Sequence, residues 1–315
     1  ARVCEGTLEY RIRLDYVLDQ FSTVPAEKMK PVIRELLRSS VYQLLYMDHV
    51  PDSAVCNEAV KLARKRGFYN LTGFVNGVLR KIVREYGSIH FPEKNSPVEY
   101  LSVIYSMPVW LVERFLSEYD FETTEKILEA SLETQPATIR IREYQVEEEA
   151  VLESLKEEQV VLEKAPYVER AYYVKNYDYL PALTAFRRGS IQVQDVSSML
   201  AGQIAAPKEG EYVIDLWAAP GGKALYIADK LHGTGRVDAR DLSQTKTDMI
   251  RDNALRQNFL NVVVTEKDAT QLDRESLEKA DIVIADVPCS GLGVIGKKKD
   301  IKYKLNPGKI RDLTG

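Results

Sequence analysis

Cysteine is scarce in this 315-residue sequence, with three widely separated copies. An odd number at such spacing argues against a disulfide framework and a zinc knuckle, so we predict no metal site and a reducing, cytoplasmic location. No run of 18 or more apolar residues occurs, so no membrane span is expected. The opening residues, ARVCEGTLEYRIRLDY, are charged and lack the apolar core of a secretory signal.

Positive and negative side chains nearly balance, which leaves a net charge of −4. Hydrophobic residues make up 45% and charged residues 29%, which is typical of a globular protein. Positive charge is concentrated at residues 61–90, with a net +6, and in KKKDIKYK at 297–304, with a net +4. Such clusters bind phosphate backbones, but charge runs are more commonly solvated helix faces. Both interpretations stay open at this point.

Hydrophobic periodicity divides the chain into three predicted domains. Residues 1–90 repeat apolar side chains at helical spacing and predict an all-α domain. Residues 91–190 begin with a proline-containing hinge and continue as a connecting region, helical over 100–133 and then a small α+β unit, that carries most of the negative charge. Residues 191–315 alternate β-branched strands with helices, which predicts an α/β domain with a doubly wound parallel sheet.

The end of the first predicted strand of this sheet, 212–218, runs into AAPGGK. Ligands bind at the carboxyl ends of the strands in such sheets. Gly221 and Gly222 permit a close backbone approach, and the helix that follows presents free N–H groups to an anionic group. Lys223 is not followed by Ser or Thr, which excludes a nucleoside-triphosphate loop.

Acidic residues follow the other three predicted strands. Asp241 ends the second strand and is placed to accept hydrogen bonds from both hydroxyls of a ribose. Asp268 follows the third strand and Asp286 the fourth, directly before Pro-Cys289. A single aspartate is more commonly a helix cap or turn former. Strand ends of this kind in register predict a pocket for an adenosine-bearing ligand, with a cysteine beside it.

The joint order of these motifs resembles the Sun/RsmB family of bacterial RNA cytosine-C5 methyltransferases. AAPGGK, DLS, DAT and DVPCSGLG resemble its methyltransferase motifs, and RRGSIQVQDVSSML resembles the segment before the first strand. MDHVPDSAVCNEAVKLARKRG and GFVNGVLRKI resemble a NusB-like domain, and YSMPVWLVERF and PATIRIRE resemble the connecting region. The resemblance implies a Rossmann-like class I methyltransferase sheet, incomplete here, after a NusB-like RNA-binding domain and the connecting region.

The family's activity is implied for this chain by the same resemblance. It implies S-adenosylmethionine as cofactor and transfer of its methyl group to C5 of a cytosine in 16S ribosomal RNA. Cofactor-binding positions carried over from the motifs are Trp217, Ala218, Ala219, Pro220, Gly221, Gly222, Lys223, Asp241, Asp268 and Asp286. Asp286 is expected near the methyl group and the target base. RNA contacts are expected from Lys61, Arg64, Lys65, Arg66, Lys297, Lys298, Lys299, Lys302 and Lys304.

The cysteine chemistry departs from the family pattern. In the RNA branch of the family the attacking cysteine belongs to a Thr-Cys pair, and the Pro-Cys cysteine, here Cys289, assists product release. No Thr-Cys pair occurs in these 315 residues, so we expect a C-terminally shortened member without its nucleophile. Trp217 and Val287 stand where cysteine and alanine are usual.

The alternative function is RNA binding without catalysis, by a chain whose methyltransferase domain is degenerate or truncated. A monomer is expected, with a dimer through the exposed edge of the fourth strand as the alternative.

Overall fold

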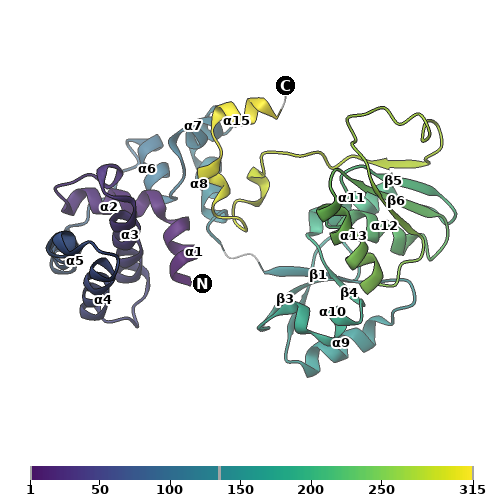
Figure 1. Ribbon diagram of the computed structural model, residues 1–315, viewed down its shortest axis with the longest axis horizontal. Helices are drawn as coiled ribbons and strands as arrows, with labels where there is room; N and C mark the ends of the chain where they lie inside the picture. Colours follow the sequence, from purple (N-terminus) through teal and green to yellow (C-terminus); the bar gives the residue numbers. More distant parts are fainter. Residues whose placement is uncertain (1, 134–135, 314–315) are drawn as a thin grey trace. The chain divides into compact units, whose positions relative to one another are not determined.

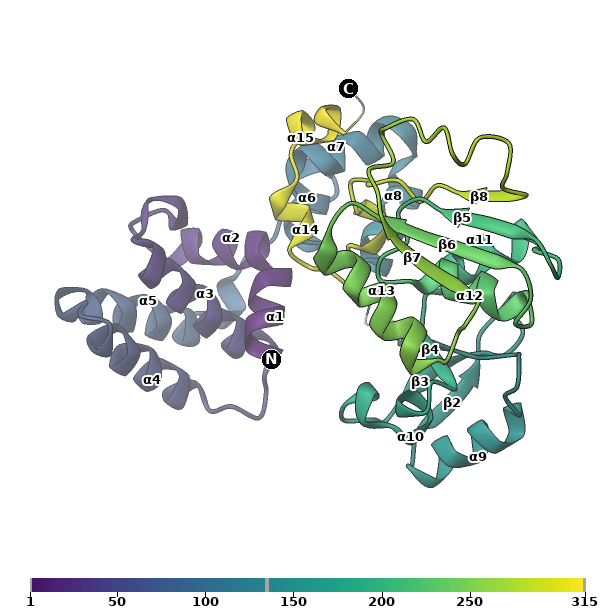
Figure 2. The same ribbon diagram turned by 45° about the vertical axis from the view of Figure 1, so that its right-hand side comes forward.

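The computed structural model describes residues 2–133 and 136–313. The chain forms two compact units. The helical unit comprises residues 1–135 together with 289–315, and the sheet unit comprises residues 136–288. Figures 1 and 2 show the elements of each unit from two directions.

The N-terminal part of the helical unit is entirely helical, as predicted. Its α-helices are α1 (Arg2–Glu9), α2 (Arg11–Phe21), α3 (Pro31–Tyr46), α4 (Asp52–Lys65) and α5 (Thr72–Arg84). Pro31 occupies the first turn of α3, where its missing N–H costs no hydrogen bond. Apolar residues recurring at helical spacing, such as Leu37 and Leu79, meet in one fully buried core.

Three further helices and the C-terminal segment complete this unit. The helices are α6 (Pro97–Ile104), α7 (Val109–Glu118) and α8 (Phe121–Ala130), followed after residue 288 by α14 (Ile301–Lys304) and α15 (Pro307–Asp312). Ile295 from the C-terminal segment packs into the core that α6 to α8 form around Leu101 and Leu111. Residues about 190 positions apart in sequence therefore share one core, and Figures 1 and 2 show α15 beside α7.

The sheet unit begins with an antiparallel sheet. Its strands are β1 (Ala137–Ile141), β2 (Val161–Lys164), β3 (Ala171–Lys175) and β4 (Ile191–Val193), in the order β2-β3-β1-β4. Helices α9 (Glu148–Glu157) and α10 (Thr184–Arg187) accompany it. Ile139 and Ile191 of the sheet share a core with Leu155 of α9. This confirms the predicted α+β character of the connecting region.

A parallel sheet follows, as the alternation of strands and helices predicts. Its strands are β5 (Tyr212–Asp215), β6 (Arg236–Asp241), β7 (Val262–Glu266) and β8 (Ile282–Ile284), in the order β7-β6-β5-β8. Helices α11 (Val196–Ala205), α12 (Gly222–Lys230) and α13 (Gln244–Arg256) lie between β4 and β7 along the chain. Leu225 of α12 and Ile250 of α13 pack on Val213 and Val237 of the strands. The predicted α/β fold class is confirmed.

The remaining elements are short 3-10 turns: η1 (Ala26–Lys28), η2 (Tyr69–Leu71), η3 (Tyr86–Ser88), η4 (Leu180–Ala182) and η5 (Leu292–Val294).

Candidate functional site

The turn between β5 and α12 is formed by the AAPGGK stretch. β5 ends at Asp215, earlier than predicted, because the chain turns and the Ala218 N–H bonds to the Arg240 carbonyl at 2.8 Å. Gly221 has φ +108°, a conformation that L side chains rarely adopt, and it precedes the first residue of α12. No side chain caps α12, so N–H groups of its first turn are available to an anionic group.

Asp241, at the end of β6, is joined to this turn. Its carboxylate is 1% exposed and accepts the Ala219 N–H at 3.1 Å and the Leu242 N–H at 2.8 Å. Lys246 Nζ lies 3.0 Å from the same carboxylate. Burial opposes ionisation, but Lys246 and the two N–H groups outweigh it and lower the pKa of Asp241. The side chain is therefore an ionised hydrogen-bond acceptor beside the AAPGGK turn.

Asp215, the last residue of β5, has the opposite electrostatic environment. The residue is 1% exposed, and neither carboxylate oxygen accepts a well-formed hydrogen bond from the described residues. Burial raises the pKa of Asp215 to about 7, against the opposing effects of Lys223 and the Trp217 N–H. A buried polar atom without a partner needs an explanation, and ligands bind at the carboxyl ends of the strands in sheets of this kind.

The motif comparison left Asp215 out of the predicted site. Its position at the end of the first buried strand, directly before the glycine turn, was the available signal.

Asp286, just after β8, meets the turn through Lys223. Lys223 Nζ lies 2.5 Å from the Asp286 carboxylate, which is 58% exposed. The ends of β5, β6 and β8 thus contribute Lys223, Asp241 and Asp286 to one region of the sheet unit. Cys289 is exposed, and it belongs to the helical unit.

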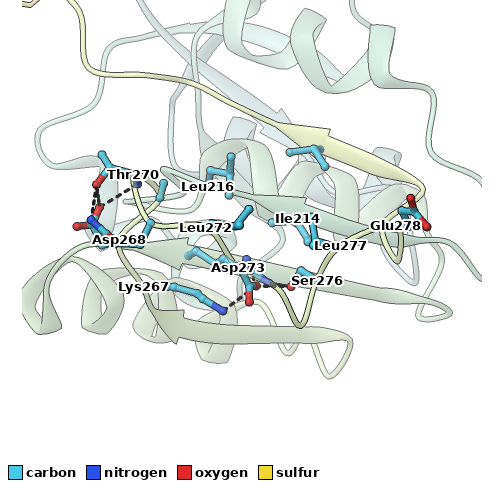
Figure 3. Close-up of a pocket in the computed structure, with 14 residues that line it drawn as sticks. Ile214, Leu216, Lys267, Asp268, Thr270, Leu272, Asp273, Ser276, Leu277 and Glu278 are labelled. Atoms are coloured by element: carbon cyan, nitrogen blue, oxygen red, sulfur yellow. Dashed lines mark hydrogen bonds and ion pairs between the residues drawn. The ribbon is translucent and has the colours of Figure 1, made fainter.

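Asp268 does not share the contacts that join Asp241 and Asp286 to the AAPGGK turn. Its carboxylate accepts the N–H and the hydroxyl of Thr270 at 2.9 and 2.8 Å, so it closes its own turn. It lines a crevice of about 490 Å³ between the loop after β7 and the sheet face at Ile214 and Val283 (Figure 3).

Among the described residues, none of the other predicted cofactor positions lines this crevice. The Lys267–Asp273 ion pair, at 2.7 Å, holds the loop (Figure 3). We therefore place the candidate site at the AAPGGK turn and not in the crevice. The role of Asp268 stays a prediction.

The two predicted basic clusters have different environments. Lys61, Arg64, Lys65 and Arg66 are all exposed, at the end of α4. In the second cluster, 297–304, Lys297, Lys298 and Lys304 are also exposed.

Lys299 and Lys302 are less exposed than these three lysines and have other contacts. Lys299 Nζ forms an ion pair with Glu9 at 2.6 Å. Lys302 is 1% exposed, and burial lowers its pKa to about 8. The neighbouring Tyr303 hydroxyl donates to the Glu9 carbonyl at 3.1 Å. These contacts hold the segment on the N-terminal helices, so Lys302 is not presented to RNA.

Residues 2–133 and 136–313 contain neither a cluster of metal ligands nor a membrane-spanning helix. No group of three or more His, Cys, Asp or Glu side chains there could hold a metal ion. None of the helices in those ranges is long and apolar enough to cross a membrane.

Sequence comparison places these features in a known family. Family profiles match the NusB family at residues 1–84, a RsmF/B-like ferredoxin-like domain at 107–177 and the 16S rRNA methyltransferase RsmB/F at 202–315. The probable ribosomal RNA small subunit methyltransferase B of Bacillus subtilis (strain 168) is 36% identical over 303 residues, covering 96% of this chain and 67% of that protein. The chain belongs to the RsmB family. The corresponding protein of Synechocystis sp. is 30% identical over 313 residues, covering 98% and 69%.

Solved structures agree with the fold of this RsmB-family chain. The crystal structure of PH0851 has a TM-score of 0.81 and 25% identity, covering 99% of this chain and 70% of that one. NSun6 from Pyrococcus horikoshii, solved with SFG, has a TM-score of 0.58 and 21% identity, covering 64% and 75%. This second likeness supports the fold alone.

The family implies S-adenosylmethionine as cofactor, and the residues at the turn fit it. Asp215 is a buried carboxylate without a well-formed partner, suited to a cationic group. The uncapped start of α12 suits a carboxylate, and Asp241 suits a ribose.

Proposed function

We propose that this RsmB-family chain binds S-adenosylmethionine at the AAPGGK turn and serves methylation of C5 of a cytosine in 16S ribosomal RNA. The observation that carries the proposal is Asp215, a carboxylate buried beside the turn with neither oxygen in a well-formed hydrogen bond. Such a group is costly in a protein interior unless a cation or donor completes it.

Each end of the cofactor has a proposed set of partners. Asp241 would accept hydrogen bonds from the ribose hydroxyls, since the residue is ionised and lies at the end of β6. The N–H groups at the start of α12 would hold the α-carboxylate. Asp215 would face positive charge on the cofactor. We propose Trp217, the other residues of the turn and Asp268 as further lining groups.

The cofactor supplies, when bound, a methyl group on a positively charged sulfur. Cytosine C5 is a weak nucleophile until a thiolate adds to C6 and raises the electron density at C5. We assign Cys289 to product release by resemblance, and not to this attack. Asp286 is held by Lys223 at 2.5 Å, and it is proposed to act near the target base.

RNA is the proposed partner of the exposed basic residues. Lys61, Arg64, Lys65 and Arg66 at the end of α4 would contact phosphates, together with Lys297, Lys298 and Lys304. A cytosine paired in helical RNA would be flipped out to react.

Calorimetric titration of S-adenosylmethionine into the intact chain tests the cofactor site. We expect micromolar binding, weakened at least about tenfold by Asp241→Ala, because charged hydrogen bonds to the ribose are lost. Asp248→Ala is the matched control, since Asp248 is exposed on α13 and pairs with Arg251. Equal affinities for the wild type and Asp241→Ala would contradict the proposed ribose contact.

The enzymatic part of the proposal has a separate assay. Tritium release from RNA labelled at C5 of cytidine would report C5 substitution directly. Cofactor and RNA binding without tritium release would favour the second candidate function, RNA binding without catalysis.

A further inference from the structure

A buried glutamine faces the start of α12 from outside the parallel sheet. Gln194 directly follows β4, and its N–H donates to the Thr138 carbonyl at 3.1 Å, which fixes its backbone. The residue is 6% exposed. Its Nε2 lies 3.4 Å from Ser198 Oγ, but no described residue donates a hydrogen bond to its Oε1.

The amide of Gln194 lies against the first residue of α12. A Cβ placed on Gly222 would lie 3.7 Å from both Cδ and Nε2 of Gln194, which is ordinary van der Waals contact. Gly222 begins the helix whose N–H groups have no side-chain cap. The side-chain amide of Gln194, whose oxygen has no donor, and the uncapped start of α12 are therefore neighbours, although Gln194 follows the antiparallel sheet and α12 follows β5 of the parallel sheet.

The side-chain oxygen takes no part in the hydrogen bonds that hold Gln194 in place. A buried acceptor without a hydrogen bond is costly, so such atoms are normally satisfied. Gln192, two residues earlier, is an internal comparison, because its Oε1 accepts from Arg256 at 2.6 Å and from Gln257 at 2.8 Å. Gln192 links structural elements, whereas the Oε1 of Gln194 has no such partner among the described residues.

We propose that Gln194 is a specificity-determining residue for the amino-acid end of the cofactor. Its Oε1 accepts a hydrogen bond from the α-ammonium group, while the first turn of α12 receives the α-carboxylate. This inference rests on the proposed function, because it needs S-adenosylmethionine at the AAPGGK turn. It assigns part of the cofactor's recognition to the segment that links the antiparallel sheet to α11.

The test compares ligands that share the adenosine and differ at the amino-acid end. S-adenosylmethionine, decarboxylated S-adenosylmethionine and 5′-methylthioadenosine would each be titrated calorimetrically into the intact wild type and Gln194→Met. The methionine side chain matches glutamine in length and lacks the amide. Gln203→Met is the matched control, since Gln203 is exposed on α11.

We expect Gln194→Met to weaken the first two ligands about tenfold, because both carry the ammonium group. Binding of 5′-methylthioadenosine, which lacks it, should change less than about twofold. Equal weakening of all three ligands would mean that Gln194 only supports the shape of the site, and it would overturn the inference. Unchanged affinity for all three would overturn it too.

Failure of the proposed function has a different signature. The wild type would then bind none of the three ligands, whatever residue occupies position 194, and the inference would be overturned with it. Thermal unfolding of both variants would confirm that a lost affinity does not come from lost folding.

Discussion

Asp215 in the sheet unit and Lys302 in the helical unit are both buried ionisable residues, each 1% exposed. Burial raises the pKa of Asp215 to about 7 and lowers the pKa of Lys302 to about 8. Lys302 has compensating neighbours, because Glu9 attracts it and its ammonium lies 5.3 Å from the ring centre of Tyr303. Asp215 has no well-formed hydrogen-bond partner among the described residues.

The difference separates two uses of a buried charge. A compensated charge such as Lys302 fixes a segment in place, at a moderate cost in stability. A buried carboxylate such as Asp215, which Lys223 offsets only in part and which lacks a well-formed hydrogen bond, indicates a place where a ligand supplies the missing partner.

Replacing Asp215 by Asn should remove a pH dependence from the sheet unit. The folded-state pKa of about 7 lies above the ordinary value of 3.8, so the folded state binds more protons between these values. The wild-type free energy of unfolding should therefore fall by about 4 kcal/mol, relative to Asp215→Asn, as pH rises from 4 to 7.

The sequence has two tryptophans, and Trp217 lies in the sheet unit. Its fluorescence during urea unfolding, in a Trp110→Phe background, is the measurement. Asp252→Asn on the exposed side of α13 is the control. If the free energies of unfolding of the wild type and Asp215→Asn changed with pH in parallel, the effect of burial on Asp215 would be contradicted.

Replacing Lys302 by Met should remove a pH dependence of opposite direction. The folded-state pKa of Lys302, about 8, lies below the ordinary 10.5, so the unfolded chain binds more protons between these values. The wild-type free energy of unfolding should rise by about 3 kcal/mol, relative to that of Lys302→Met, between pH 8 and 10.5. Below pH 8 the free energies of unfolding of the two proteins should change with pH in parallel. Trp110 fluorescence in a Trp217→Phe background reports this unit, and Lys304→Met is the exposed control.

Glu9→Gln should destabilise the helical unit by about 2 kcal/mol at pH 7, since it leaves buried positive charge without its counter-charge. The loss should be smaller in a Lys302→Met background, which a double-mutant cycle measures. Lys61→Ala is the comparison, because its ion pair with Glu58 is exposed on both sides and contributes under about 1 kcal/mol. An equal loss in both backgrounds would show that Glu9 does not compensate Lys302.

The exposed basic residues should affect RNA binding where Lys302 does not. Changing Lys61, Arg64, Lys65 and Arg66 together to Ala should weaken binding of a single-stranded 16S rRNA fragment about tenfold and reduce the salt slope by about 3. Fluorescence anisotropy at several salt concentrations is the measurement. Lys302→Met should leave both quantities unchanged, and a comparable loss in that variant would contradict its burial.

Much of the fold could be predicted from local sequence signals. Alternating apolar strands and helices specified the parallel sheet, and the glycine pair located the turn at which Gly221 adopts φ +108°. The first strand was predicted too long, since it was expected over 212–218 and β5 ends at Asp215. Hydrophobic runs continue into the turn residues, so their length does not mark where the ladder ends.

The environment of single charges could not be predicted in the same way. KKKDIKYK reads as one exposed basic run, yet Lys302 is buried beside Glu9, whose position is 293 residues earlier in the sequence. The roles proposed for Gln194 and Asp215 likewise depend on neighbours that belong to other helices and strands. Local patterns carry no information on such distant contacts.

The second of the two boundaries between the units lies between Pro288 and Cys289, within the DVPCSG motif. It has a practical consequence for anyone who wishes to dissect this protein. A fragment that begins after the N-terminal helices would retain Ile295 and Tyr303 but lose Leu101, Ser106 and Glu9, on which they pack. Apolar surface would then be uncovered and the fragment would tend to aggregate. Fragments meant to fold on their own should therefore match the two compact units, so that residues 289–315 stay together with the N-terminal helices.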